Sequence, residues 1–589
     1  MERIPFVGLH AHCGVGSPFD GFGYPKDHMD YAHSNGAKAL ALTDHGNMNG
    51  LVYQVMHAKK MQAEGKDFKP IFGVEAYFIP SVAEWKEQIE VFRKDKKLAK
   101  QIDKGQSGTT IENEGASKSV SKHDINKRRH LVLLAQNQTG LNNIFKMVSQ
   151  SYTGDNFYRY PRIDLALLEE YGEGVIAASA CLGGVYAGCY WENRDEGPEA
   201  ILNCMLKVTE EMQAVMGDRW YGELQWNNIP EQHELNQYII QVHERTGLKL
   251  ISTCDSHYPS PEAWQSRELY KRLGWLGRKP EWASMELPLT VDEVGYELYP
   301  KNGNQMWDSY KFYSEACGVT YNDDIVYQSI IETATIAFDR IESFLPDTTV
   351  RLPDFVVPAG TDDTSYLGQL AFEGLLSVLG SKGIKQNSPQ FRDYNKRLNS
   401  ELDVINAQGF AKYFLTMKAI VDKTSEVQLA GPGRGSAAGS LVAYALEITQ
   451  VDPIEYGLLF SRFLRTDQTD MPDIDYDVSD PMVLKEKLIE DWGDDVVVPI
   501  SNWNTLQLKS LIKDVSRLYE IEFSEVNPVT SKMIGEATPL AKARHGIKAG
   551  VYTPTLSEVM EFSESLRGFF RKYPKIEKHC RDLAGQVKS

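Results

Sequence analysis

Two carboxylates that lie two residues apart follow a glycine-rich turn in the second half of the sequence. The turn is GPGRGSAAGS at 431–440, and the carboxylates are Asp473 and Asp475 in MPDIDYD. On an extended strand, side chains at i and i+2 leave the same face, so both carboxylates could bind the same divalent ions. A glycine such as Gly435 lets the backbone approach a phosphate closely. This order of motifs is typical of metal-dependent nucleotidyl transfer.

A second set of side chains suited to metal binding lies in the first half of the chain. Eleven of the 13 histidines precede residue 258, and several follow short apolar runs such as AKALALT, PIFG and LKLIST. If these runs are successive barrel strands, side chains at their ends converge on one mouth. The candidate ligands are His10, His12, Asp20, His45, Glu75, His130, Cys181, Asp255 and His257.

Each pattern also has an ordinary structural interpretation. A glycine-rich turn can be only a turn, acidic segments are commonly solvated, and a barrel can keep such residues for folding around one structural metal. The remaining early histidines fit surface or core positions better than a metal site; they are His28, His33, His57, His123, His233 and His243.

The stretch that joins the glycine turn to the carboxylate pair, residues 431–478, resembles the palm core of the C-family polymerases, the alpha subunits of bacterial replicative DNA polymerase III. The resemblance implies a DNA-directed DNA polymerase with two Mg²⁺ ions, acting on primer–template DNA and deoxynucleoside triphosphates. It assigns catalysis to two residues and nucleotide binding to four: Asp473 and Asp475, and then Gly435, Ser436, Arg462 and Lys509.

The candidate metal ligands of the first half resemble those of the polymerase and histidinol phosphatase (PHP) domain. That domain is a distorted (β/α)7 barrel that binds up to three ions, Zn²⁺ or Mn²⁺, and all nine ligand positions are filled here. Asp20 departs from the pattern, since it lies about one residue farther from His12 than expected. The resemblance implies 3′→5′ exonuclease proofreading, with pyrophosphate hydrolysis as another possibility.

These motifs predict an α/β protein of three domains. Residues 1–275 are expected to form the PHP barrel, 276–504 the first segment of a polymerase-beta-like α+β palm, and 505–589 a mostly helical thumb. The charged stretch from 84 to 129 is expected to be an exposed insertion that begins as a helix. Helical spacing of apolar residues recurs in YLGQLAFEGLLSVLG and in TLQLKSLIKDVSRLYE.

Composition limits the other possibilities. The formal charge of −18 is unfavourable for DNA binding, but residues 501–589 hold 14 Lys and Arg against 10 Asp and Glu. That excess suits a thumb that grips DNA, and equally a solvated helical surface. The chain lacks an apolar run long enough for a membrane span, and its seven cysteines form no CxxC pair. We therefore predict a soluble cytoplasmic protein with reduced cysteines and no membrane partner.

The family resemblance also implies a third catalytic aspartate, on a palm strand that follows the thumb. This sequence stops at RDLAGQVKS, before that strand. Three explanations stay open: a split polymerase, as in a phage genome, whose second polypeptide completes the palm and fingers; a truncated chain; or a stand-alone metal-dependent phosphoesterase or exonuclease with a vestigial polymerase half. A non-enzymatic DNA-binding scaffold is disfavoured by the two ligand sets. We expect negligible DNA synthesis by this chain alone.

Overall fold

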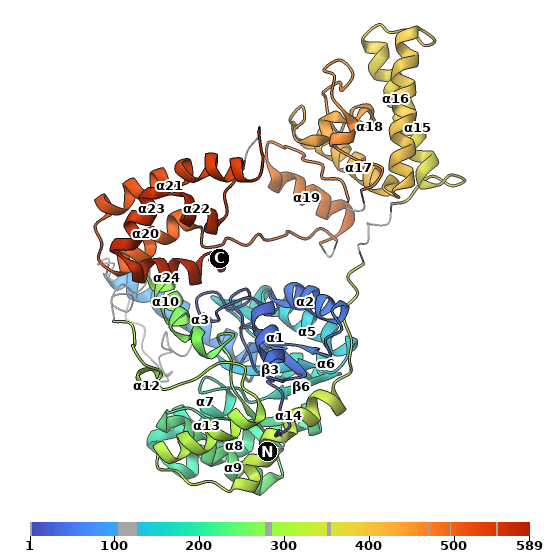
Figure 1. Cartoon of the computed structure of the whole chain (residues 1–589). Coiled ribbons are helices and arrows are strands. Elements are labelled where there is room, and N and C mark those ends of the chain that lie inside the picture. Colours follow the sequence, from blue (N-terminus) through green and yellow to red (C-terminus); the bar gives the residue numbers. More distant parts are fainter. Residues whose placement is uncertain are drawn as a thin grey trace. The chain divides into compact units, whose positions relative to one another are not determined.

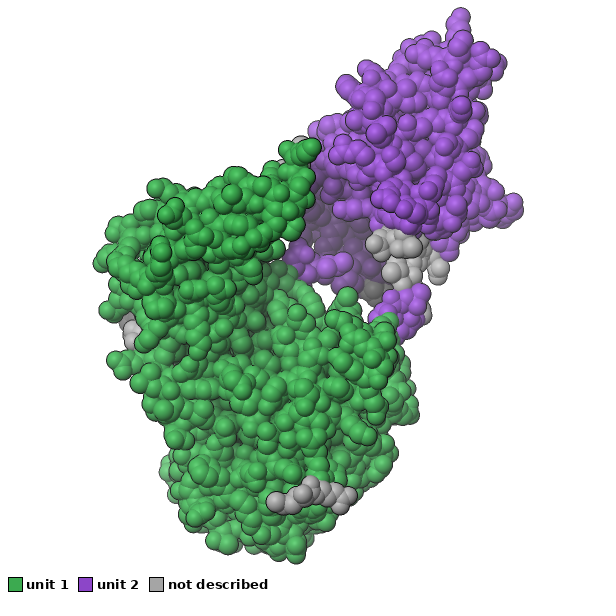
Figure 2. Space-filling view, viewed as in Figure 1, with its two compact units in different colours: residues 1–346, 503–589 green, residues 347–502 purple. Residues whose placement is uncertain are grey.

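The computed structural model divides into two compact units, which Figure 2 colours separately. Unit 1 combines residues 1–346 with 503–589, and unit 2 spans 347–502. Residues 104–125 of the predicted insertion lie outside the described residues, and its first part forms the helix α3 (Val82–Asp103) as expected. The described residues are 3–103, 126–276, 286–349, 355–468, 471–494, 496–548 and 552–589.

Unit 1 is built around a six-stranded sheet with the order β1-β2-β3-β6-β7-β8. An extended segment pairs in parallel with both edges, through Gly8 with Leu40 and through Ala11 with Ser256, and so closes the sheet into a barrel. This confirms the distorted (β/α)7 barrel. The strands are β1 (Ala39–Leu42), β2 (Lys69–Phe78), β3 (Arg129–Ala135), β6 (Val175–Ala178), β7 (Trp220–Gln225) and β8 (Leu250–Thr253).

Helices cover the outside of this sheet, and Figure 1 shows α1, α2, α5 and α6 against it. The strands β1, β6 and β8 are buried at every residue, as expected when one face meets the barrel interior and the other meets helices. The covering helices are α1 (Pro25–Ser34), α2 (Leu51–Ala63), α5 (Gln138–Ser151), α6 (Leu165–Tyr171), α7 (Val185–Asn193), α8 (Pro198–Met216) and α9 (Pro230–Thr246).

The interior of the barrel has an apolar layer and a polar layer. Ile71 and Glu75 share the inner face of β2, because residues four apart in a strand point the same way. Ile71 belongs to a buried apolar cluster with Ile176 and Ile251 from facing strands. Glu75 lies nearer the other end of β2, and it is fully buried. The polar layer therefore rests on a packed hydrophobic floor.

Residues beyond the predicted boundary at 275 complete that floor. Ile336 and Ala337, which follow α14, join the same apolar cluster. The ammonium of Lys69 donates to the carbonyls of Ala337 at 2.6 Å and Ile341 at 2.5 Å. The first part of unit 1 consequently extends to Pro346. Its further helices are α10 (Trp264–Trp275), α12 (Val291–Val294), α13 (Gly303–Ala316) and α14 (Asp323–Thr335).

The described residues after Trp503 form helices, as predicted for the thumb region, and they pack within unit 1. Tyr270 of α10 shares one buried core with Leu511 and Phe569 from these helices. The backbone N–H of Gly23 donates to the side-chain oxygen of Gln586 at 3.1 Å. The helices are α20 (Leu508–Leu518), α21 (Phe523–Arg544), α22 (Leu556–Phe562), α23 (Glu564–Lys572) and α24 (Pro574–Leu583).

Unit 2 is helical in the residues described there, whereas the sequence predicted an α+β palm. Its extended segments meet at an antiparallel bridge between Ala430 and Val478, and no strand of the described part of unit 2 forms a sheet. The predicted helix YLGQLAFEGLLSVLG is confirmed as part of α15. The helices are α15 (Asp363–Ser381), α16 (Pro389–Ala407), α17 (Ala411–Val427), α18 (Leu441–Ala445) and α19 (Pro481–Trp492).

The cysteines differ from the sequence expectation at one pair. Cys189 of α7 and Cys204 of α8 form a disulfide with their Cα atoms 5.6 Å apart. Sequence spacing does not indicate this pair, because it arises from the packing of α7 against α8. Within the described ranges, no helix has both the length and the apolar character needed to cross a membrane.

Candidate metal centre

All nine predicted ligands meet in the polar layer of the barrel. Most of them lie where the sequence placed them, in or just after strands that run parallel to one another. His45 follows β1, Glu75 lies in β2, Cys181 follows β6, and Asp255 and His257 follow β8. The extended segment that closes the barrel supplies His10 and His12.

His130 reaches the same place by a different route. It lies at the beginning of β3, and not at the end of a strand, but β3 is antiparallel to its neighbours. The start of a reversed strand lies at the same edge as the ends of the others, and the register pairs His130 with Tyr77 near the end of β2. The reversal therefore brings His130 to the mouth.

Glu75 is the centre of one half of the site. Its carboxylate oxygens lie 2.5 Å from His45 Nδ1 and 2.9 Å from His130 Nδ1. They also lie 3.3 Å from His10 Nε2 and 3.6 Å from His12 Nε2. The sulfur of the remaining predicted ligand in this half, Cys181, lies 3.9 Å from Glu75 Oε1.

Asp255 and Asp20 organise the other half. Asp255 Oδ1 lies 3.1 Å from His12 Nε2 and 3.5 Å from His257 Nδ1. Asp20 Oδ2 lies 3.1 Å from His45 Nε2 and 3.8 Å from His257 Nε2. Asp20 thus joins the site in spite of its unusual sequence spacing. Asp255 has a φ of 48°, a backbone conformation that non-glycine residues rarely adopt and that is concentrated at functional sites.

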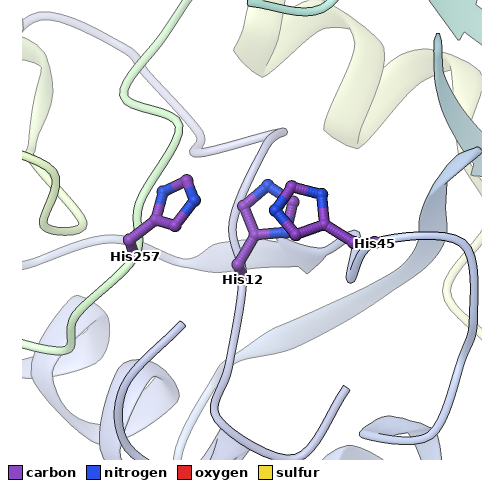
Figure 3. A group of neighbouring side chains, drawn as sticks. All are labelled: His12, His45 and His257. Carbon is purple, nitrogen blue, oxygen red and sulfur yellow. The ribbon is translucent and has the colours of Figure 1, made fainter. Parts of the chain in front are cut away.

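Three overlapping groups have ligand atoms close enough to hold an ion, within 4.8 Å of one another. Figure 3 shows the first group, in which the imidazole of His12 lies between those of His45 and His257. The ring centroid of His12 is 4.1 Å from that of His45 and 4.5 Å from that of His257. The other two groups are His10, His12 and Glu75, and His45, Glu75 and His130.

The arrangement of the carboxylate oxygens and imidazole nitrogens suits a bound divalent cation better than it suits hydrogen bonds between these side chains. Glu75 Oε2 and Asp255 Oδ1 are buried and have no hydrogen-bond partner among the described residues. Each nevertheless lies within 3.6 Å of an imidazole nitrogen. Buried carboxylate oxygens are nearly always hydrogen-bonded, so close contacts without hydrogen-bond geometry suggest that a cation belongs between them. Imidazole, carboxylate and thiolate suit Zn²⁺, and imidazole with carboxylate suits Mn²⁺.

The electrostatics keep the carboxylates ionised. Burial alone would raise the pKa of Glu75, yet the imidazoles around it, His130 first, hold that pKa well below its usual range. The pKa of Asp20 is also well below its usual range, because interactions with His257, His45 and Arg267 together outweigh the effect of burial. Both carboxyl groups are therefore in the form that binds metal.

Three residues that sequence reasoning missed support the ligands. Glu223 of β7 lies 2.7 Å from His10 Nδ1 and accepts a hydrogen bond from Thr253 at 2.5 Å. Arg267 of α10 donates to Asp20 Oδ1 at 2.6 Å. Asp44 accepts hydrogen bonds from the loop that carries Asp20, at Cys13 N and Ser17 Oγ. Glu223 had a sequence signal, since a lone acid interrupts the strand WYGELQ.

In unit 2 the structure brings the glycine turn onto the Asp-x-Asp segment. Gly435 has a φ of 65°, and a Cβ built there would lie 2.2 Å from Asp475 Oδ2, so only glycine fits. The segment is extended without being a strand, with Ile474 buried and Asp473 exposed. Arg434, which sequence reasoning missed, lies 3.8 Å from Asp475 Oδ1 and 3.0 Å from Asp477 Oδ1.

Of the other predicted nucleotide-binding residues, Ser436 lies in this turn, Arg462 lies in a 3₁₀ turn that packs against it, and Lys509 lies in unit 1. Ser436 begins a four-residue 3₁₀ turn, too short to act as a helix N-terminus. Arg462 is exposed in a second 3₁₀ turn of unit 2. Lys509 is exposed on α20, in unit 1. Their assignment to nucleotide binding stays a prediction.

Two family models match this chain. The PHP domain matches residues 8–226, and the bacterial DNA polymerase III alpha NTPase domain matches residues 365–579. A solved amidohydrolase from Chromobacterium violaceum matches at 14% identity with a TM-score of 0.22, over 45% of this chain and 96% of that one, which is too weak to carry an argument.

Curated relatives agree with the family models. The DNA polymerase III subunit alpha of Aquifex aeolicus is 33% identical over 88% of this chain and 40% of the relative. Those of Borreliella burgdorferi and Helicobacter pylori J99 are each 30% identical, over 90% and 100% of this chain and 40% and 43% of the relative. The chain thus spans about 40% of the length of these relatives. Most of the chain is therefore similar to bacterial DNA polymerase III alpha subunits, and its two matched regions correspond to the PHP domain and to part of the polymerase region.

Proposed function

We propose that the PHP domain of this chain removes nucleotides from the 3′ end of DNA, as the proofreading part of a DNA polymerase. The observation that carries the proposal is the complete set of nine ligand candidates around Glu75 and Asp255 in a buried layer. When bound, up to three Zn²⁺ or Mn²⁺ ions would lower the pKa of water and stabilise charge on a phosphoryl group. In the reaction a water oxygen bonds to phosphorus and the P–O3′ bond breaks. The 3′ oxygen takes up a proton, and a nucleoside 5′-monophosphate leaves.

The exposure of the ligands indicates the side from which substrate approaches. The side chains of His10, His12 and Glu75 are fully buried. Those of Asp20 and His130 are 43% and 21% exposed. A phosphodiester would therefore meet the outer ligands first. Arg267 and Glu223 would keep the outer and inner ligands oriented through their hydrogen bonds to Asp20 and His10.

The test uses the purified chain with Mn²⁺ and a primer with a mispaired 3′ end. Cleavage that disappears in the double variant His10→Ala with His12→Ala, together with loss of bound metal measured by elemental analysis, supports the proposal. His33→Ala is the matched control, because His33 lies on α1 outside the cluster. No cleavage by the unchanged chain, or cleavage that persists in the double variant, refutes it. Pyrophosphate as the sole substrate would favour the phosphoesterase alternative.

A second activity, nucleotidyl transfer, is supported by the approach of Gly435 to Asp475. We propose that Asp473 and Asp475 hold two Mg²⁺ ions for the incoming triphosphate, opposite a primer 3′ hydroxyl. A second polypeptide that completes the palm stays a prediction. Primer extension by the chain mixed with a candidate partner, if it is abolished by Asp473→Asn, would support both the catalytic role of Asp473 and the need for a second polypeptide. Extension by the chain alone would refute the need for a partner, and extension unaffected by Asp473→Asn would refute the catalytic role.

A further inference from the structure

Arg128 is a half-buried cation at the mouth of the candidate metal centre. It immediately precedes β3, two residues before the candidate ligand His130. Its Nε is buried without a hydrogen-bond partner, and its Nη1 makes one long contact, 3.4 Å from the carbonyl of Asn126. Within the described ranges no carboxylate lies within 4.0 Å of this guanidinium. Among the described residues, this guanidinium therefore has N–H donors and a positive charge that no carboxylate matches.

The two flanking basic residues are different. Lys127 Nζ lies 2.5 Å from Glu192 Oε2, and Arg129 pairs with Glu192 Oε1. One carboxylate thus pairs with both neighbours. Because side chains alternate along an extended chain, Arg128 leaves the opposite face from these two and the same face as His130. Of these three cations, the one without a carboxylate partner among the described residues therefore lies on the side of the ligands.

Two tyrosine rings hold Arg128 in place. Its guanidinium carbon lies 3.6 Å from the ring centroid of Tyr160, in the short hairpin β4–β5 (Phe157–Tyr158 and Tyr160–Pro161), and 5.0 Å from that of Tyr77. Aromatic faces attract a guanidinium and fix its position, but they leave its charge and its N–H groups free for an anion.

Tyr77 connects this cation to the metal centre. It shares the inner face of β2 with Glu75, two residues away. Its ring centroid lies 5.4 Å from that of His130 and 6.4 Å from that of His45, to which it is parallel within 10°. One ring therefore separates Arg128 from two candidate ligands.

We propose that Arg128 binds a phosphate group of the substrate next to the one that is hydrolysed, and so acts as a positioning residue of the PHP centre. The inference rests on the proposed phosphoester hydrolysis. A guanidinium donates two parallel hydrogen bonds to phosphate oxygens, which fixes orientation as well as charge. That phosphate comes either from the adjoining nucleotide of a DNA strand or from the second half of pyrophosphate.

The first experiment measures binding without catalysis. Arg128→Gln, Lys127→Gln and the unchanged chain are titrated with a labelled single-stranded oligonucleotide in EDTA over a range of salt concentrations. One lost phosphate contact lowers the slope of log affinity against log salt by about 0.7 for a single strand. We expect that change in Arg128→Gln only, because Lys127 is already paired with Glu192. Equal slopes in all three proteins overturn the DNA-strand assignment.

The second experiment measures hydrolysis with Mn²⁺, separately for the oligonucleotide and for pyrophosphate. For the true substrate we expect Arg128→Gln to raise KM about tenfold with little change in kcat, since about 1.4 kcal/mol of binding corresponds to a factor of ten. Arg128→Lys keeps the positive charge but loses the two parallel N–H donors. Its KM should therefore lie between those of the unchanged chain and Arg128→Gln. An unchanged KM for both substrates in Arg128→Gln, with bound metal retained, overturns the proposal.

The two proposals fail in different ways. If the unchanged chain hydrolyses neither substrate, the proposed function is refuted, and the binding experiment still decides whether Arg128 contacts a phosphate. If hydrolysis is normal and Arg128→Gln alters neither the salt slope nor either KM, only the role of Arg128 is refuted.

Discussion

The metal centre of the barrel and the Asp-x-Asp segment of unit 2 use the same kinds of carboxylate in opposite settings. Glu75 is fully buried and surrounded by side chains from several strands. The side chain of Asp475 is 37% exposed and lies on one extended segment beside Arg434. Exposed ion pairs are worth little, whereas buried ones depend on every partner. Folding therefore fixes the arrangement of the candidate ligands in the barrel, whereas bound ions and substrate would have to fix that of the carboxylates in unit 2.

The largest expected effect comes from the centre of the buried site. Glu75→Gln keeps the shape of the side chain and removes its charge, leaving the surrounding imidazoles without their main counter-charge. We expect unit 1 to lose about 3–5 kcal/mol of stability, the usual cost of breaking a buried pair, together with its bound metal. Thermal unfolding with and without Mn²⁺ measures both. Glu169→Gln, an exposed change on α6, should behave as the unchanged chain. Unaltered metal content in Glu75→Gln would show that the buried site does not depend on its central carboxylate.

Replacing Glu223, which contacts the candidate ligand His10, should have a smaller effect. Glu223→Gln keeps an oxygen that can accept from His10 but loses the charge, whereas Glu223→Ala loses both. Because such partners orient a ligand without touching the ion, we expect a 10- to 100-fold weaker metal affinity for Glu223→Ala and a milder loss for Glu223→Gln. Metal titration gives the affinities. Equal affinities in both variants and the unchanged chain would contradict the orienting role.

In unit 2 the corresponding change adds a methyl group where the backbone of Gly435 approaches Asp475. Gly435→Ala places a methyl group against Asp475 at a positive φ, which should cost unit 2 about 1–3 kcal/mol. Gly457→Ala is the matched control: its φ is 62°, yet nothing lies within 4 Å of the added carbon. The difference between their unfolding midpoints isolates the contact with Asp475. Equal midpoints would mean that the turn and the Asp-x-Asp segment are not held together.

The smallest expected effect is a pH dependence of unit 2. Burial raises the pKa of Asp452, but hydrogen bonds from Lys382 and Tyr394 outweigh burial and lower it. A lowered pKa stabilises the folded state above the unfolded value of about 3.9, and this stability is lost as the pH falls further. Asp452→Asn should thus lower the unfolding midpoint of unit 2 by a few degrees at pH 7 and by less near pH 3. A constant difference from pH 7 to pH 3 would contradict the assignment.

The candidate ligands could be predicted because their chemistry is local. An imidazole or carboxylate at the end of an apolar run can be identified as a candidate ligand from its residue type alone. The ends of barrel strands converge on one mouth, whatever the length of the loops between them. Asp20 is different, because it was included as the acid that follows His12 in the PHP ligand pattern, in spite of its displaced spacing. The supporting residues Arg267 and Arg434 could not be predicted, since an arginine in a helix or a turn looks like any solvated charge until its partner is known.

The sequence by itself determined the ligand types, the short apolar strands that carry them and the helices after 505. These depend on side-chain chemistry and on contacts between near neighbours. Only the tertiary structure decided that β3 is reversed, so that His130 reaches the mouth from a strand's beginning, and that residues near 336 close the barrel floor. It alone also placed Arg128 between two tyrosines, without a carboxylate partner among the described residues, while Glu192 pairs with both of its neighbours. Strand direction and charge pairing arise from residues distant in sequence, which meet only when the chain has packed.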